Sequence, residues 1–217
     1  EHPAKVSYDE VVKRKLELCS SLAELASAVL LDPTFGAAQC ISHNVLPKST
    51  GLLVSIETSG DYGDKEHRLT KLMENWNVEK IKRMGASAVK ILLYYRPDLT
   101  KIASKQQNTV NMLASECKKY DLPLLVEPVS YPIGDEIDNP QELAALKGQL
   151  VITTAREISA LPIDVLKTEF PADLHYKHNN SELLNLCRQL DTASQVPWVV
   201  LSAGVDFELF YQQVEIA

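Results

Sequence analysis

Six apolar runs alternate with helix-like segments along the chain, and this alternation limits the fold more than any other feature. The runs are SAVLLDP, GLLVSIETSG, SAVKILLYYRPD, LPLLVEPVSYP, LPIDVLKTEFP and VPWVVLSAGVD. No hairpin signal joins consecutive runs, and each interval is long enough for a helical crossover. Continuously apolar strands with helical crossovers predict a parallel sheet that is covered by helices.

The segments between these runs carry apolar residues at the spacing of an α-helix. Gly85 marks a turn, and DYGDKEHRLTK is polar and is expected to be a mobile loop. Ser181 is expected to cap one helix. We expect helices over residues 8–26, 35–47, 76–84, 109–120, much of 140–159, 181–192, and from about 207 onward.

The positions of the polar residues favour a barrel over an open sheet. In a TIM barrel the site is assembled from the ends of several strands, whereas an open doubly wound sheet uses one switch point and a glycine-rich turn. Neither GxGxxG nor GxxxxGK occurs in the chain. Polar residues lie within or at the ends of all six runs: Asp32, Glu57, Lys90, Glu127, Lys167 and Ser202.

The expected fold is therefore an α/β (β/α)8 TIM barrel. A barrel of this type takes about 250 residues, and the chain has 217. It begins and ends with helix-like segments, so we expect a single barrel domain over residues 1–217 that lacks its first strand and its last strand-helix unit.

Net charge, the lengths of the apolar runs and the spacing of the cysteines restrict which partners and which cellular compartment we expect. The net charge is -7 and no basic cluster occurs, so neither nucleic acid nor an anionic membrane surface is expected as a partner. No apolar run approaches the roughly 20 residues of a membrane-spanning helix, and the segment EHPAKVSYDE has no signal-peptide pattern. The four cysteines form no CxxC pair, which favours reduced thiols in a cytoplasmic protein. The sequence leaves a homo-oligomer open.

Two strand lysines are the main candidates for chemistry. Lys167 lies where an apolar run ends, so it must pair, reach water or lose its proton. A neutral lysine attacks carbonyls to form a Schiff base, whereas the structural alternative is an ion pair with Glu169. Lys90 lies on another strand, and two ammonium groups at one barrel mouth favour loss of a proton from the less solvated one. Glu127 can stabilise one cation and carry protons. Each residue alone fits a structural pair, but the joint pattern favours a site.

Six segments resemble one known family, the class I tagatose 1,6-bisphosphate aldolases, and several of them also occur in its sulfofructose-phosphate aldolase relatives. They are LLDPTFG, GLLVSIETSG, GASAVKILLYYRPD, LLVEPV, IDVLKTEFP and VPWVVLSAGVD. The resemblance covers nearly the whole chain in order. It implies a barrel without metal or cofactor, which uses a lysine to form a Schiff base with dihydroxyacetone phosphate.

The resemblance also implies roles for individual residues. The Schiff-base lysine falls on Lys167, the second active-site lysine on Lys90 and the general acid/base on Glu127. The substrate-binding aspartate falls on Asp32. The phosphate-binding turn falls on Ser202, Ala203 and Gly204. The family's Gly-Arg turn and its first-strand aspartate motif are absent, so the second anchor of the substrate stays undefined.

The implied activity is cleavage of a ketose 1,6-bisphosphate, such as tagatose 1,6-bisphosphate, to dihydroxyacetone phosphate and glyceraldehyde 3-phosphate. The phosphorylated sugar is the expected small-molecule partner. The alternatives are a sulfofructose-phosphate aldolase and a non-catalytic sugar-phosphate sensor on the same fold. The sequence does not separate tagatose from fructose bisphosphate or from a sulfonated substrate.

Two further motifs carry weaker signals. Arg96 follows two tyrosines at a strand end, where it can hold an anionic group of a substrate or pair with Asp98; the residues alone leave both interpretations open. His175 and His178 have the i, i+3 spacing of metal ligands. They lack a nearby third histidine, so no metal site is expected.

Overall fold

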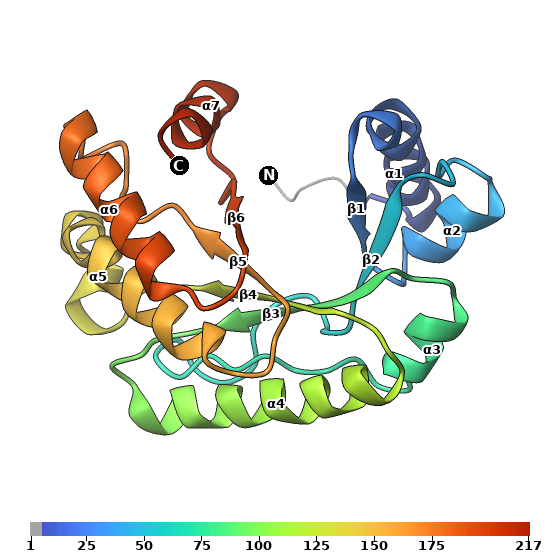
Figure 1. Ribbon diagram of the computed structural model, residues 1–217, viewed down its shortest axis with the longest axis horizontal. Helices are drawn as coiled ribbons and strands as arrows, with labels where there is room; N and C mark the ends of the chain where they lie inside the picture. Colours follow the sequence, from blue (N-terminus) through green and yellow to red (C-terminus); the bar gives the residue numbers. More distant parts are fainter. Residues whose placement is uncertain (1–5) are drawn as a thin grey trace.

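The computed structural model describes residues 6–217 as six parallel strands in one sheet, surrounded by helices. The first five residues of the N-terminal segment, in which the sequence shows no signal-peptide pattern, lie outside this range. The strand order follows the chain, so β1 and β6 are the two edges. The sheet curls into an open half-barrel (Figure 1). The strands are β1 (Ala28–Leu31), β2 (Gly51–Ser55), β3 (Ala88–Tyr94), β4 (Leu124–Val129), β5 (Val165–Glu169) and β6 (Trp198–Leu201).

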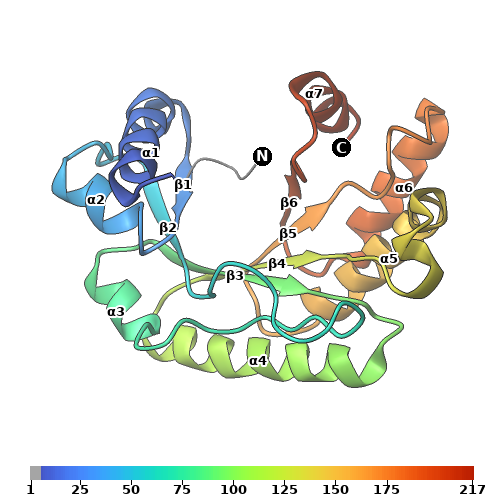
Figure 2. The same cartoon turned by 180° about the vertical axis from the view of Figure 1, so that it is seen from behind.

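The helices lie along the outer side of this curl, as the view from behind shows (Figure 2). Each crossover between consecutive parallel strands contains helix, as the alternating sequence predicts. The α-helices are α1 (Tyr8–Leu22), α2 (Ala37–Ser42), α3 (Val78–Arg83), α4 (Thr100–Lys119), α5 (Pro140–Ser159), α6 (Asn180–Ala193) and α7 (Phe207–Ile216). Short 3-10 turns follow α1 (η1, Ala23–Leu25) and precede α5 (η2, Gly134–Ile137). The α/β class and the parallel sheet are thus confirmed.

Strand β3 shows how alternation gives the sheet two different faces. Val89, Ile91 and Leu93 are 0% exposed and belong to the core cluster between sheet and helices. Burying each of these side chains stabilises the fold by about 1.5–3 kcal/mol. Lys90 and Tyr94 have the opposite parity, so they lie on the concave face. A strand that is buried on both faces can therefore carry a lysine on its inner side.

Several helix boundaries differ from the sequence-based expectation: α1, α2 and α3 are shorter than the expected ranges 8–26, 35–47 and 76–84. Helix α4 begins at Thr100 rather than Thr109, because its polar first half is held by contacts that periodicity does not reveal. There, Gln106 is 1% exposed and its Nε2 donates a hydrogen bond to the carbonyl of Tyr94 at 3.0 Å. Helix α6 is capped by Asn179, whose side chain accepts from the backbone of Ser181 and Glu182, so the predicted cap at Ser181 was two residues late.

The turn predicted at Gly85 is present and sets the start of β3. Gly85 has φ 88°, a left-handed conformation that glycine adopts without a Cβ penalty. Its N–H donates to the carbonyl of Lys82 at 3.0 Å, which closes the end of α3. The chain then enters β3 only a few residues before Lys90, so this turn helps to fix the height of that lysine in the sheet.

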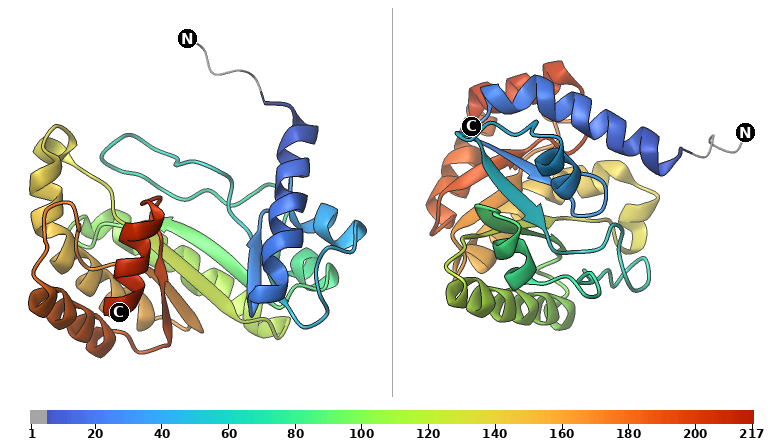
Figure 3. Two further views of the ribbon diagram at one scale, coloured as in Figure 1. Left: turned by 90° about the horizontal axis from the view of Figure 1, so that it is seen from above. Right: turned by 90° about the vertical axis from the view of Figure 1, so that its right-hand side faces the viewer.

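The polar segment after β2 folds back on itself, where the sequence suggested a mobile loop. Isolated antiparallel bridges join Glu57 to Leu72 and Tyr62 to Leu69. We call this segment the hairpin 57–72; Figure 3 shows it extending from β2 as a long arm. The hydroxyl of Thr70 donates to the carbonyl of Leu92 at 2.7 Å, which ties the arm to β3. The hairpin therefore lies close to the C-terminal half of that strand.

Candidate active site

Four charged side chains form a continuous row across the concave face. Lys90 lies on β3, Glu127 on β4 and Lys167 on β5, whereas Glu57 follows β2 by two residues. Lys90 Nζ lies 2.6 Å from Glu57 Oε1 and 2.9 Å from Glu127 Oε2. The other oxygen of Glu127, Oε1, lies 3.1 Å from Lys167 Nζ. Glu127 thus bridges the two lysines with one oxygen for each.

Strand register explains why these residues meet. Leu92 pairs with Glu127, and Val126 pairs with Leu166, so the residues after that pair, Glu127 and Lys167, are neighbours on β4 and β5. Side chains of one parity on adjacent parallel strands point to the same face. Because the strands lie side by side in chain order, the three candidates from distant parts of the sequence reach one place.

The two lysines differ in how far their side chains are buried. The side chain of Lys90 is 7% exposed, and those of its partners Glu57 and Glu127 are 10% and 6% exposed. The side chain of Lys167 is 23% exposed and has one carboxylate partner instead of two. Lys90 is therefore held between two carboxylates, whereas Lys167 is the amine that an incoming carbonyl can reach. Glu127 can accept or return the proton of that amine, since the two groups already lie within hydrogen-bonding distance.

Glu169, the structural partner that the sequence offered for Lys167, pairs elsewhere. Its Oε2 accepts hydrogen bonds from the backbone N–H and the hydroxyl of Ser130, at 2.7 and 2.6 Å. Its Oε1 lies 3.3 Å from Lys147 Nζ. Glu169 therefore links β5 to the loop after β4 and to α5, and leaves Lys167 to Glu127.

Asp32 lies just after β1 in a tight turn. Its Oδ1 accepts from the backbone N–H groups of Thr34 and Phe35 at 2.9 and 2.7 Å, and its Oδ2 lies 2.7 Å from Lys15 Nζ on α1. Burial by itself raises the pKa of Asp32, but the hydrogen bond and charge of Lys15 and the two backbone donors outweigh it and hold the pKa below its usual value. Asp32 thus has its own partners, and its role in substrate binding stays a prediction.

These contacts predict a pH-dependent contribution of Asp32 to stability. We expect Asp32→Asn to lower the free energy of unfolding at neutral pH by about 1 kcal/mol. Because the folded pKa lies below the unfolded value of about 3.9, this stabilisation is complete above the unfolded value and is lost as pH falls through the folded one. Urea denaturation of both proteins between neutral pH and about pH 3 should show the two curves converging. If the difference in free energy of unfolding between the two proteins stayed constant over this range, the charge of Asp32 would not be the source of the stabilisation.

The turn after β6 exposes backbone donors. Ala203 and Gly204 have φ values of 53° and 73°, two successive left-handed residues, and Ser202 accepts a hydrogen bond from the N–H of Val205 at 3.2 Å. Within residues 6–217, the N–H groups of Ala203 and Gly204 have no hydrogen-bond partner. Free N–H groups in such a turn form a concavity suited to anions. This geometry supports the predicted phosphate-binding turn, which stays a prediction.

Arg96 is a buried structural centre. It is 1% exposed, and its guanidinium donates to Asp98 at 2.9 and 2.7 Å, to Glu136 at 2.5 and 3.0 Å and to the carbonyl of Tyr131 at 2.9 Å. The hydrogen bond from Arg96 holds the pKa of Asp98 below its usual range. Of the two interpretations that the sequence left open, this geometry favours the pair with Asp98. Arg96 has its donors occupied within the protein, so we leave it out of the proposed substrate site.

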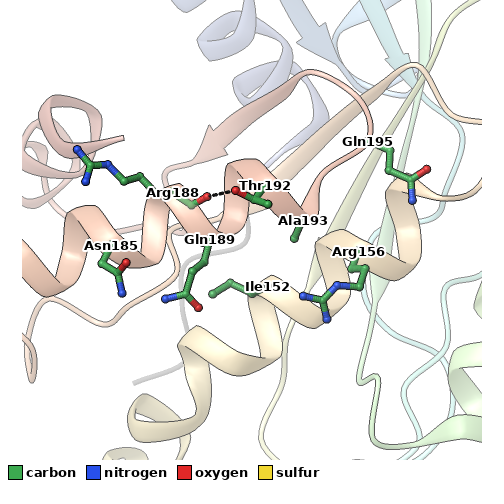
Figure 4. A pocket seen from close by; sticks show the side chains of 8 residues that line it. All are labelled: Ile152, Arg156, Asn185, Arg188, Gln189, Thr192, Ala193 and Gln195. Atoms are coloured by element: carbon green, nitrogen blue, oxygen red, sulfur yellow. Dashed lines mark hydrogen bonds between the residues drawn. The ribbon is translucent and has the colours of Figure 1, made fainter.

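Other features of the described residues lie away from this row. A groove of about 560 Å³ between α5 and α6 is lined by two arginines, Arg156 and Arg188, and by other polar and apolar side chains (Figure 4). It contains none of the four charged residues of the row. Within residues 6–217, no group of three or more His, Cys, Asp or Glu side chains is placed to hold a metal ion. The same range contains no helix with the length and apolar character needed to cross a bilayer.

Comparison with known proteins decides the family. The sequence model of the DeoC/LacD family aldolases matches residues 9–217. The chain belongs to this family. It is 31% identical over 215 residues to tagatose 1,6-diphosphate aldolase 1 of Streptococcus mutans, and the match covers 94% of this chain and 65% of the relative. It is 29% identical over 221 residues to a tagatose 1,6-diphosphate aldolase of Staphylococcus aureus, with 96% and 67% covered. The chain of this DeoC/LacD family member thus spans about two thirds of the length of these relatives.

Solved structures support the fold of this DeoC/LacD family member. An archaeal fructose-1,6-bisphosphate aldolase, with its catalytic Lys bound to a carbinolamine intermediate, has TM-score 0.62 and 18% identity over 97% of this chain and 71% of that one. A fructose-bisphosphate aldolase from Slackia heliotrinireducens has TM-score 0.65 and 12% identity, with 99% and 64% covered. At such identities the likeness concerns the fold alone.

Proposed function

We propose that the complete protein is a class I aldolase that cleaves a ketose 1,6-bisphosphate, such as tagatose 1,6-bisphosphate. The products are dihydroxyacetone phosphate and glyceraldehyde 3-phosphate. One observation carries the proposal: Glu127 bridges Lys90 and Lys167, and Lys167 is the more exposed of the two lysines. The names of the relatives support the substrate class. A cytoplasmic location is part of the proposal, in line with four cysteines that are free thiols.

The proposed reaction begins at the amine of Lys167. Neutral Nζ attacks C2 of the open-chain ketose, and Glu127 donates a proton to the carbonyl oxygen as the carbinolamine forms. Loss of water then gives the iminium. A base removes the proton of the C4 hydroxyl, the C3–C4 bond breaks, and its electron pair moves into the iminium to give an enamine. The aldehyde product leaves at this stage. Protonation of C3 and addition of water release dihydroxyacetone phosphate and restore Lys167.

The surrounding elements have roles in this proposal. Lys90 neutralises and orients Glu127 from the side opposite to Lys167. The turn Ser202–Gly204 offers free N–H groups to the phosphate at C1. We further propose that the six strands are part of one eight-stranded barrel domain, which the curled sheet and the share of the relatives covered support.

A cleavage assay on the full-length protein tests this function against its alternatives. Tagatose 1,6-bisphosphate, fructose 1,6-bisphosphate and 6-deoxy-6-sulfofructose 1-phosphate are supplied in turn, and release of dihydroxyacetone phosphate is measured with a coupled reductase. We expect cleavage of a bisphosphate. Cleavage of the sulfonated sugar alone would instead identify a sulfofructose-phosphate aldolase. A sensor would show a raised melting temperature with the sugars but no cleavage of any of them.

Lys90→Met is expected to lower cleavage at neutral pH and to shift Schiff-base formation to higher pH. Methionine keeps most of the bulk but removes the cation held by Glu57 and Glu127, so both carboxylates then favour the protonated form of Lys167. Activity should recover in part as pH rises. The exposed Lys105 on α4 offers the matched control, Lys105→Met. A variant that loses stability but keeps the wild-type pH profile would show that Lys90 has a structural role only.

A further inference from the structure

Arg68 on the hairpin 57–72 lies against two aromatic rings at the C-terminal ends of the strands, which contact each other edge to face. Its guanidinium carbon is 5.9 Å from the centroid of the Tyr94 ring and 5.3 Å from that of Tyr131. Tyr94 is the last residue of β3, and Tyr131 follows β4 by two residues. Cation–π attraction to two rings holds the planar guanidinium in one orientation. The hydroxyl of Tyr131 also donates to the carbonyl of Glu66 at 3.4 Å, which fixes the arm beside Arg68.

The donors of this guanidinium are largely unused. Its Nε lies 3.1 Å from Asp61 Oδ2, in a geometry that does not form a hydrogen bond. Within residues 6–217, neither terminal nitrogen of Arg68 donates a hydrogen bond. Both nitrogens reach solvent, because only Nε of this side chain is a buried polar atom without a partner. The side chain is 28% exposed. The fork of Arg68 is therefore both held in place and open to a ligand, unlike that of Arg96.

Arg68 lies above the row of catalytic candidates. Leu92 pairs with Glu127 and Tyr94 with Val129, so Tyr94 is two residues, roughly 7 Å, beyond the height of Glu127. Tyr94 also shares the concave face with Lys90. Burial raises the pKa of Tyr94. The negative charges of Asp61 and Glu57 raise it further, whereas the positive charges of Arg68 and Lys90 lower it. The tyrosine thus lies between the charged row and the arm.

The position of Arg68 indicates which end of a substrate it would meet. The turn Ser202–Gly204 follows β6, which pairs with β5 on one side of Lys167. Arg68 contacts the ends of β3 and β4 on the other side. A substrate attached to Lys167 through C2, with its C1 phosphate at the turn, would extend its other end toward Arg68. An arginine fork binds phosphate and sulfonate oxygens in a bidentate manner, which a lysine does not.

We propose that Arg68 binds the oxyanion at the end of the substrate remote from C1, and that Tyr94 and Tyr131 hold it ready for this contact. This inference rests on the proposed function and supplies the second anchor that the sequence leaves undefined. Asp61 balances the charge of Arg68 until the oxyanion takes its place. The hairpin 57–72 thereby becomes a determinant of specificity for ketoses that carry an oxyanion at both ends.

The test compares substrates that differ only at the remote end. The full-length wild type, Arg68→Met, Arg68→Lys and the hairpin control Lys71→Met are assayed with tagatose 1,6-bisphosphate and tagatose 1-phosphate. For Arg68→Met we expect kcat/KM to fall about 30-fold with the bisphosphate, mainly through KM, since a hydrogen-bonded charge pair is lost. With tagatose 1-phosphate the change should stay within about 3-fold. Arg68→Lys should recover part of the loss, and Lys71→Met should resemble the wild type.

Two further measurements separate the possible outcomes. A parallel assay with 6-deoxy-6-sulfofructose 1-phosphate shows whether the remote oxyanion is phosphate or sulfonate. Only for the substrate whose oxyanion binds Arg68 should kcat/KM fall by the large factor in Arg68→Met. Borohydride trapping of dihydroxyacetone phosphate, which lacks the remote group, should be equal in the wild type and Arg68→Met. Equal losses with both tagatose phosphates, or none, would overturn the role of Arg68 while leaving the aldolase standing. Failure of the wild type to trap dihydroxyacetone phosphate would overturn the proposed function itself.

Discussion

Lys167→Met is expected to lower the rate of ketose bisphosphate cleavage by about 10³-fold or more, since no other amine replaces the nucleophile. Lys90 does not substitute for it, because its side chain is 7% exposed and lies between Glu57 and Glu127. The fold should tolerate the change. Lys167 is partly exposed, and Glu127 keeps Lys90 as its partner, so the free energy of unfolding should change by about 1 kcal/mol or less.

Steady-state rates and denaturation curves of the two proteins measure this prediction. Lys101→Met, at an exposed position on α4, provides the control for loss of a lysine elsewhere. A Lys167→Met protein that retains a substantial fraction of wild-type turnover would assign the nucleophile to another residue. A large loss of stability would instead mean that Lys167 is needed for the fold.

Glu127→Gln is expected to lower both activity and stability. The side chain of Glu127 is 6% exposed and bridges two ammonium groups, so its neutralisation leaves an uncompensated positive charge in the concave face. We expect the free energy of unfolding to fall by about 2–3 kcal/mol, because Glu57 still pairs with Lys90 and limits the loss. Proton transfer by Glu127 should contribute about 10²–10⁴-fold to the rate, and the variant should lose that factor.

A double variant separates charge balance from packing. In Glu127→Gln/Lys167→Met, Lys90 and Glu57 remain as a neutral pair, so the double variant should be more stable than Glu127→Gln alone while staying inactive. Glu116→Gln, on the exposed side of α4, controls for a carboxylate change outside the row. Additive stability losses in the double variant would contradict the electrostatic coupling of the three residues. Urea denaturation at neutral pH provides all of these values.

The sequence predicts much of the fold because each strand is an uninterrupted apolar run that stands out from the helix-like segments around it. Each apolar run became a parallel strand, since β-branched and large residues without hairpin turns favour buried parallel strands. Helix α4 shows the limit: its polar first half is helical through burial of Gln106 against β3, a tertiary contact that periodicity does not contain. Likewise, the polar hairpin 57–72 pairs with itself and with Leu92, and its composition does not indicate these contacts.

The candidate site was predictable where charge interrupts an apolar strand. Lys90, Glu127 and Lys167 stand out for that reason, and the consecutive strand order brings them together. The choice of partners was not predictable. Glu136 is 40 residues from Arg96 in the chain, yet it fixes that arginine in the interior. Arg68 lies in a polar segment that the sequence does not mark as part of a site. Only its contacts with Tyr94 and Tyr131 in the structure make it a candidate.

Identification of the residue that forms the Schiff base tests the proposed mechanism most directly. The full-length protein is incubated with dihydroxyacetone phosphate, reduced with sodium borohydride, digested and analysed by mass spectrometry. We expect one stable adduct, on Lys167, which is absent from Lys167→Met and present in the Lys101→Met control. An adduct on Lys90, or no adduct on any lysine while the protein still cleaves its substrate, would contradict this mechanism.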